Sequence, residues 1–94
     1  MITHAVLFKL KDPSNIQKTR EVLLGMDGKI PQIRNLEVGV DVVRSQRSYD
    51  LALITRFDSM EDLQAYQVHP VHVEVLNYIT SVRESVVAVD FQTV

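Results

Sequence analysis

Cysteine is absent from the 94-residue chain, and long hydrophobic runs are missing as well. Without cysteine the chain can form neither a disulfide nor a thiolate metal site, which is typical of a protein in a reducing compartment. No apolar run approaches the roughly 20 residues of a membrane span, and the N-terminal residues alternate in polarity instead of forming a signal-peptide core. These absences predict a cytoplasmic protein with no membrane partner.

The sequence also lacks a strong excess of one charge. Ten basic and twelve acidic residues give a net charge of −2, and the basic residues are scattered. Such a chain has no field that would gather phosphates, so nucleic acid is not an expected partner. There is no glycine-rich phosphate loop, no nucleophile elbow and no mark of haem or flavin binding, so we expect no cofactor and no covalent catalysis.

Hydrophobic residues, by contrast, make up 46% of the chain. The length fits one domain over residues 1–94, and no linker, repeat or low-complexity tract divides it. So small a domain cannot hide this much apolar surface with one layer of helices on one sheet. The composition therefore favours a second copy of the chain as partner.

Alternation of apolar and polar residues predicts four β-strands, at residues 2–10, 36–42, 49–57 and 85–91. The first, third and fourth of these carry apolar residues on both faces. In the fourth strand we expect Val87 and Val89 to face inward, towards the helices, and Val86 and Ala88 to face outward.

Capping chemistry predicts where the helices lie. Asp12 and Pro13 fit the N-cap and first position of a helix that ends at Gly25 or Gly28. A capping box that begins at residue 59 predicts a second helix up to residue 68. Proline disfavours the helical conformation for the residue before it, so the His69-Pro70 pair predicts a break and then a short helix over residues 70–79.

The resulting order is β-α-β-β-α-β, an α+β fold of the split βαβ type. It predicts a four-stranded antiparallel sheet with all helices on one face and the other face open. Two such open faces can close into a barrel, so we expect a homodimer that forms through the open sheet face.

A phenol and two imidazoles lie within seven residues, at Tyr66, His69 and His72. The helical period places His72 on the apolar side of its helix, and alternation places His4 on the helix-covered face of the first strand. We expect His4, Tyr66 and His72 to converge as a catalytic set, because imidazole exchanges protons near neutral pH and a phenol can donate to a carbonyl. The expected ligand-binding residues beside them are Phe8, Leu63, His69 and Leu76.

The same residues also have a structural interpretation. His4 and His72 could pair as core histidines, Tyr66 could pack with its hydroxyl at the rim, and His69 could cap the broken helix. His69 and His72 are three residues apart, a spacing that can align two metal ligands on one helical turn. Pro70 changes this register and no third ligand is evident, so we expect no metal.

Five segments occur in an order and spacing that are specific only together: residues 2–11, 36–39, 47–51, 57–59 and Tyr66-Gln67-x-His69-Pro70-x-His72-Val73. With them, essentially the whole chain resembles the stress-responsive A/B barrel (Dabb) domain family. The resemblance implies a ferredoxin-like protomer in a dimeric α/β barrel. In some members a cation lies on backbone oxygens near the end of the first helix, here around Asp27 and Ile30.

Most members of that family have no assigned reaction. One group of plant members is similar to polyketide cyclases, which close a linear polyketide by aldol condensation without a cofactor, and the matching residues here would be His4, Tyr66 and His72. Our first hypothesis is a homodimeric Dabb protein of unassigned role that binds a small apolar molecule. The alternative is a cofactor-independent, polyketide-cyclase-like lyase. A third class, the monooxygenases of the same barrel type, has no supporting feature in the sequence.

Overall fold

The sheet is built around β1 (Ile2–Leu10), which is hydrogen-bonded to a neighbour on each side. The computed structural model describes residues 1–93. Its sheet has the order β2-β3-β1-β4, and every neighbouring pair is antiparallel. The other strands are β2 (Asn35–Val40), β3 (Leu51–Phe57) and β4 (Arg83–Gln92). This arrangement confirms the predicted α+β, split βαβ topology.

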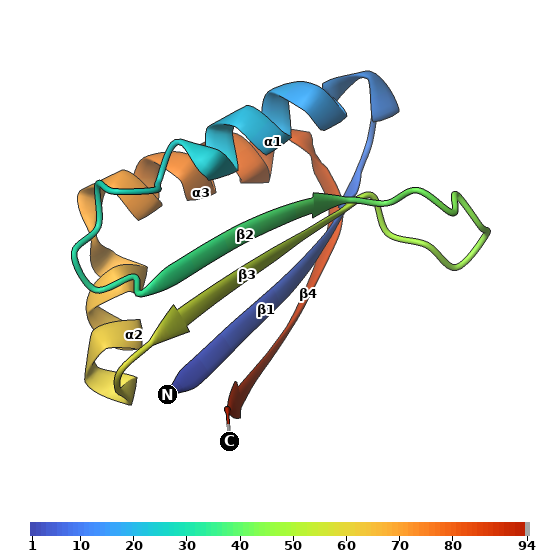
Figure 1. Ribbon diagram of the computed structural model, residues 1–94. Coiled ribbons are helices and arrows are strands. Elements are labelled where there is room, and N and C mark those ends of the chain that lie inside the picture. Colours follow the sequence, from blue (N-terminus) through green and yellow to red (C-terminus); the bar gives the residue numbers. More distant parts are fainter. Residues whose placement is uncertain (94) are drawn as a thin grey trace.

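The helices lie on one face of the sheet, with α1 and α3 side by side across it and α2 at one end (Figure 1). A short 3-10 turn, η1 (Pro13–Asn15), leads into α1 (Ile16–Leu24), and β3 is followed by α2 (Met60–Val68) and α3 (Pro70–Val82). Within residues 1–93 no helix is both long enough and apolar enough to cross a membrane.

The predicted capping contacts form, although Asp12 caps the 3-10 turn η1 and α1 itself begins after Asn15. The Asp12 carboxylate accepts a hydrogen bond from the Ser14 N–H, and the Ser59 hydroxyl accepts one from the Asp62 N–H. His69 is extended, with ψ of 136°, and its Nδ1 accepts the Val71 N–H at 3.1 Å, so it ends α2 and caps α3. The His69-Pro70 pair therefore breaks the helix as predicted.

The third helix is longer than predicted and continues to Val82. The hydroxyl of Thr80 donates to the Leu76 carbonyl, and that of Ser81 donates to the Tyr78 carbonyl. These bonds to the preceding turn let polar residues remain helical beyond residue 79, where the predicted helix ended.

The prediction for the two faces of β4 is wrong. Val86 lies opposite Phe8, and Ala88 lies opposite Val6, so both face the helices. Val87 and Val89, which are 45% and 58% exposed, lie on the open face. Apolar residues occupy both sides of this strand, so alternation could not determine which side faces inward.

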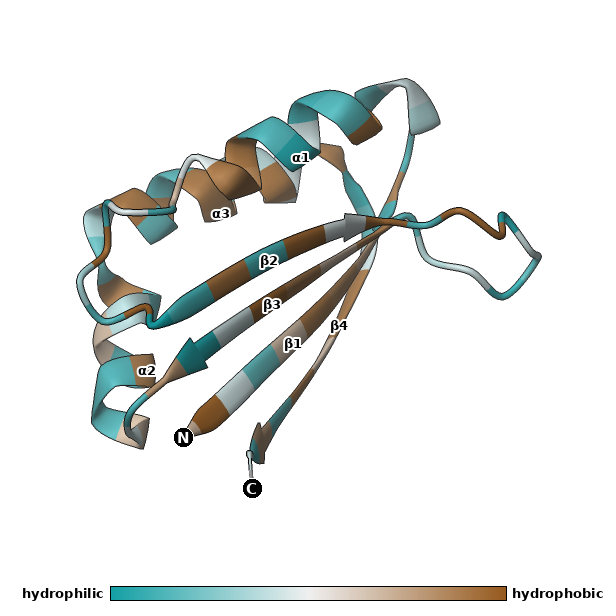
Figure 2. Ribbon diagram, in the orientation of Figure 1, coloured by the Kyte–Doolittle hydropathy of each residue, from teal (hydrophilic) through white to brown (hydrophobic). Residues whose placement is uncertain are grey.

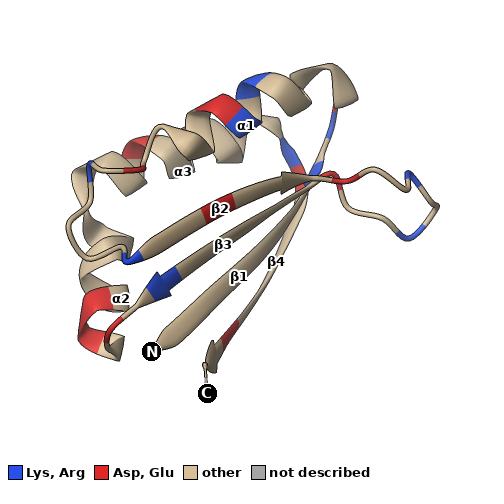
Figure 3. Cartoon of the chain, viewed as in Figure 1, with Lys and Arg blue, Asp and Glu red and all other residues tan. Residues whose placement is uncertain are grey.

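Hydrophobic residues accordingly recur along all four strands, although helices cover only one face (Figure 2). The core between sheet and helices is formed by buried apolar residues from every layer. They are Val6, Phe8, Leu10, Leu23, Met26, Ile30, Leu51, Leu53, Phe57, Leu63, Tyr66 and Ile79. Charged residues of both signs are scattered over the elements (Figure 3).

Asp50 joins the start of β3 to the end of β1. Its carboxylate is buried, accepts the Leu10 N–H at 2.7 Å and accepts a guanidinium N–H of Arg44 at 2.8 Å. Burial by itself raises the pKa of this carboxyl, but these two donors more than offset burial, so the pKa lies below its usual value.

Replacing Asp50 by alanine should destabilise the fold by about 1–3 kcal/mol, because the Leu10 N–H loses its acceptor. Urea denaturation at pH 7 measures this loss. In the wild type this contribution is present at neutral pH and should disappear as the pH falls through the lowered pKa. The control is Asp58→Ala, which removes an exposed pair with Arg34 and should cost less than about 1 kcal/mol. Equal costs for the two variants would contradict this interpretation.

Candidate functional site

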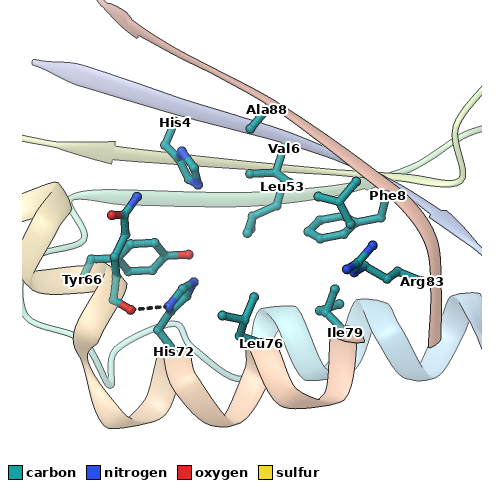
Figure 4. Close-up of a pocket in the computed structure, with 12 residues that line it drawn as sticks. His4, Val6, Phe8, Leu53, Tyr66, His72, Leu76, Ile79, Arg83 and Ala88 are labelled. Atoms are coloured by element: carbon teal, nitrogen blue, oxygen red, sulfur yellow. Dashed lines mark hydrogen bonds between the residues drawn. The ribbon is translucent and has the colours of Figure 1, made fainter. Parts of the chain in front are cut away.

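A pocket of about 580 Å³ lies between α3 and the sheet (Figure 4). Most of its wall is apolar, and the polar side chains are few. The lining residues are His4, Val6, Phe8, Leu53, Tyr66, Gln67, His72, Leu76, Ile79, Arg83, Val86 and Ala88. A concave, mostly apolar site with a few polar groups is the usual form of a small-molecule site.

His72 lies in the first turn of α3, and the helix break fixes its ring. Its Nδ1 is 3.0 Å from the backbone oxygen of Gln67 in α2. A carbonyl can only accept, so Nδ1 carries the proton and Nε2 of the neutral ring has a free lone pair. Nε2 points into the pocket (Figure 4).

The charge state of His72 follows from its surroundings. Burial lowers the pKa of the imidazole, and the neighbouring His4 and His69 lower it further, while the bond to Gln67 opposes them. The ring is therefore neutral at pH 7. A neutral imidazole with a free Nε2 is suited to accept a proton from a bound molecule.

Tyr66, in the last turn of α2, packs against the ring of His72 and is 1% exposed. Its ring centroid is 4.3 Å from that of His72 and 5.0 Å from that of Phe57. Figure 4 shows its hydroxyl pointing into the pocket between His4 and His72. Because burial raises the pKa of the phenol, it stays protonated and can donate a hydrogen bond.

His4 enters the same space from β1, with its ring edge-on to Tyr66 at 6.1 Å between centroids. Its Nδ1 is hydrogen-bonded to the carboxylate of Asp90, its cross-strand neighbour on β4. A carboxylate can only accept a hydrogen bond, so Nδ1 of His4 carries the ring proton. The Nε2 atom then has a free lone pair. Asp90 was not predicted, because the pairing depends on the register between the first and last strands.

The structure brings five of the seven predicted site residues to the pocket: His4, Phe8, Tyr66, His72 and Leu76. Leu63 and His69, which were also expected there, are not among the residues that line the pocket. Leu63 is buried in the core, and the imidazole of His69 is engaged at the helix junction.

Reasoning from the sequence did not single out the other lining residues, which are Val6, Leu53, Gln67, Ile79, Arg83, Val86 and Ala88. Val86 and Ala88 were missed because the predicted faces of β4 were inverted. The position of Gln67 directly after Tyr66 was the one feature of the sequence that could have predicted its place at the pocket. No feature of the sequence pattern indicated that Arg83 would line the pocket.

Residues 1–93 contain no group of three or more His, Cys, Asp or Glu side chains that could hold a metal ion. The Nδ1 atoms of His69 and His72 each bond to the backbone of this chain. The side chains of His4, Tyr66 and His72 can supply proton transfer and hydrogen bonding.

The model of the stress responsive A/B barrel domain matches residues 2–93 of the chain. The stress-response A/B barrel domain-containing protein DABB1 of Arabidopsis thaliana is 32% identical over 97 residues, an alignment that covers 97% of this chain and 46% of that protein. A second stress-response A/B barrel domain-containing protein from the same plant is 27% identical over 95 residues, with 97% of this chain and 36% of that protein covered. The chain thus spans half or less of the length of these relatives.

Solved structures show the same fold. A dimeric ferredoxin-like protein of unknown function from Thermobifida fusca has a TM-score of 0.87 at 29% identity, covering 98% of this chain and 90% of that one. A dimeric protein of unknown function from Bacteroides fragilis gives 0.84 at 29%, with 98% and 95% covered. A hydroxynitrile lyase from Passiflora edulis shares the fold at 0.82 and 15% identity, with 96% and 90% covered. The match of the family model over nearly the whole length shows that this chain belongs to the stress responsive A/B barrel domain family.

Proposed function

We propose that this chain acts as a homodimer in which each pocket binds a small, largely apolar molecule that carries a carbonyl group. The observation that carries the proposal is that Nε2 of His72 and the hydroxyl of Tyr66 face one apolar space of about 580 Å³. The phenol is a donor for a carbonyl oxygen. The aliphatic wall is suited to hold a hydrocarbon chain.

The homodimer is proposed to form through the open sheet face. Leu7, Val87, Val89 and Phe91 are exposed there, and β1 and β4 place them side by side. Exposed apolar surface of this kind is typical of an interface. The relatives from Thermobifida fusca and Bacteroides fragilis are dimeric, which supports a second copy as the occupant.

A second candidate function is cofactor-independent acid–base catalysis by a lyase or a cyclase. It is favoured by the neutral state of His72 and by the protonated state of Tyr66. In this scheme Nε2 of His72 removes a proton from the carbon next to the carbonyl, and the C–H electrons move onto the carbonyl oxygen. The Tyr66 hydroxyl stabilises the resulting enolate.

In a cyclase, the enolate carbon then forms a bond to a second carbonyl carbon of the same molecule. The oxygen of that carbonyl receives the proton that His72 holds, so the base is regenerated and no other reactant is consumed. His4, whose Nδ1 is bonded to Asp90, is proposed to accept at Nε2 a hydrogen bond from the hydroxyl group that this oxygen becomes. The Passiflora edulis protein, a hydroxynitrile lyase with the same fold, supports a reaction of this class.

Binding is tested with octan-2-one as probe, by thermal unfolding with and without the ketone. At a concentration about ten times Kd, the ketone should raise Tm by about 5 °C or more. His72→Ala should lose most of this rise, because it opens the polar end of the pocket to water. Glu74→Ala, an exposed position on the same helix, should keep it. A wild type that octan-2-one does not stabilise, or a full rise in His72→Ala, would refute the proposal.

A further inference from the structure

A β-bulge interrupts the regular register at the start of β4. Up to Lys9, which lies opposite Ser85, the residues of β1 and β4 pair one to one, but Leu10 lies opposite Arg83. Glu84 is therefore the extra residue of the bulge. In an unbroken strand Arg83 would share the open face with Val87, because alternate residues point to the same side. The bulge instead aligns Arg83 with Leu10, on the face that the helices cover.

This change of side places a guanidinium at the pocket. Figure 4 shows Arg83 beside Phe8 and Ile79, at the end remote from His72 and Tyr66, with aliphatic side chains between the two ends. The pocket thus has a donor and base at one end, an apolar middle and a cation at the other end.

Within residues 1–93, Arg83 forms no ion pair with an acidic side chain, and no acidic residue lines the pocket. The two acidic residues of β4 are engaged elsewhere. Glu84 lies 3.9 Å from Lys9 Nζ, and Asp90 is bonded to His4 at the opposite end. A guanidinium that lines an apolar pocket without a counter-ion is a suitable partner for a carboxylate, which it can bind through two parallel hydrogen bonds.

We propose that Arg83 recognises a carboxylate at the far end of the ligand, so that the pocket prefers medium-chain keto acids to neutral ketones of the same length. This inference rests on the proposed function, since the ketone group is the one that meets Tyr66 and His72. Arg83 is then the residue that determines specificity, and it takes no part in proton transfer.

The test compares the binding of 7-oxooctanoate and octan-2-one by calorimetry, because the two probes differ only in the terminal carboxylate. The wild type should bind 7-oxooctanoate about tenfold or more tightly than octan-2-one. Arg83→Gln should abolish this difference between the two probes, and Arg83→Lys should keep part of the preference. His72→Ala should weaken the binding of both probes.

The outcomes separate the two proposals. If the wild type binds octan-2-one as tightly as 7-oxooctanoate, or if Arg83→Gln keeps the preference, the role of Arg83 is refuted and the proposed function stands. If the wild type binds neither probe, the proposed function is refuted, and the inference about Arg83 with it.

Discussion

Replacing Val87 and Val89 together by aspartate is expected to convert the dimer into monomers. Both side chains lie on the open face of β4, and in a symmetric dimer each substitution occurs twice. Losing the burial of four valines, at about 1.5 kcal/mol each, weakens association by roughly four orders of magnitude, before the cost of placing carboxylates in the interface. Sedimentation at micromolar concentration should then show a species of 10.7 kDa.

The control for this experiment is Val73→Asp, which places the same charge at an exposed apolar position on α3, outside the sheet. It should sediment like the wild type, at twice the chain mass. A wild type of 10.7 kDa would contradict the proposed dimer directly. A double variant that stays dimeric would show that the copies meet on some other surface.

Replacing His72 by glutamine is expected to slow catalysed proton exchange next to a ketone by about 10²–10⁴-fold, the usual contribution of a general base. The reaction is followed by proton NMR in D₂O with nonane-2,4-dione as probe. In the wild type the rate should rise with pH as His72 loses its proton, and then level off. Because burial lowers the pKa of His72, the midpoint should lie below about 6.5, the value of a free imidazole.

Tyr66→Phe serves as the companion variant for this measurement. It should reduce the rate without moving the midpoint to higher pH, because the phenol stabilises the enolate and does not take the proton. A midpoint at or above that of free histidine, or an unchanged rate in His72→Gln, would refute the role of His72 as base.

The parts of the fold that were predictable are those that local chemistry determines. Asp12, Ser59 and the His69-Pro70 pair mark helix ends through contacts within a few residues, so the sequence alone shows them. The placing of His4, Tyr66 and His72 on inward faces also follows from local periodicity. Their convergence then follows from the split βαβ order.

The parts that were not predictable depend on pairing between distant segments. The bond between His4 and Asp90 joins residues 86 positions apart, and it exists only in one register of β1 against β4. The same register decides that Val86 and Ala88 face the pocket. Arg83 needed in addition a bulge of one residue, which no alternation pattern of β4 reveals.

The measurement that tests the central claim most directly is a long-range ¹H–¹⁵N NMR spectrum of the imidazoles at pH 7.5, with the His72 signals assigned through His72→Gln. We predict a neutral ring with its proton on Nδ1 and a bare Nε2, and we predict that octan-2-one shifts the signals of that ring. An imidazolium, or a ring with its proton on Nε2, would contradict the claim that His72 presents a base to a carbonyl compound in this pocket.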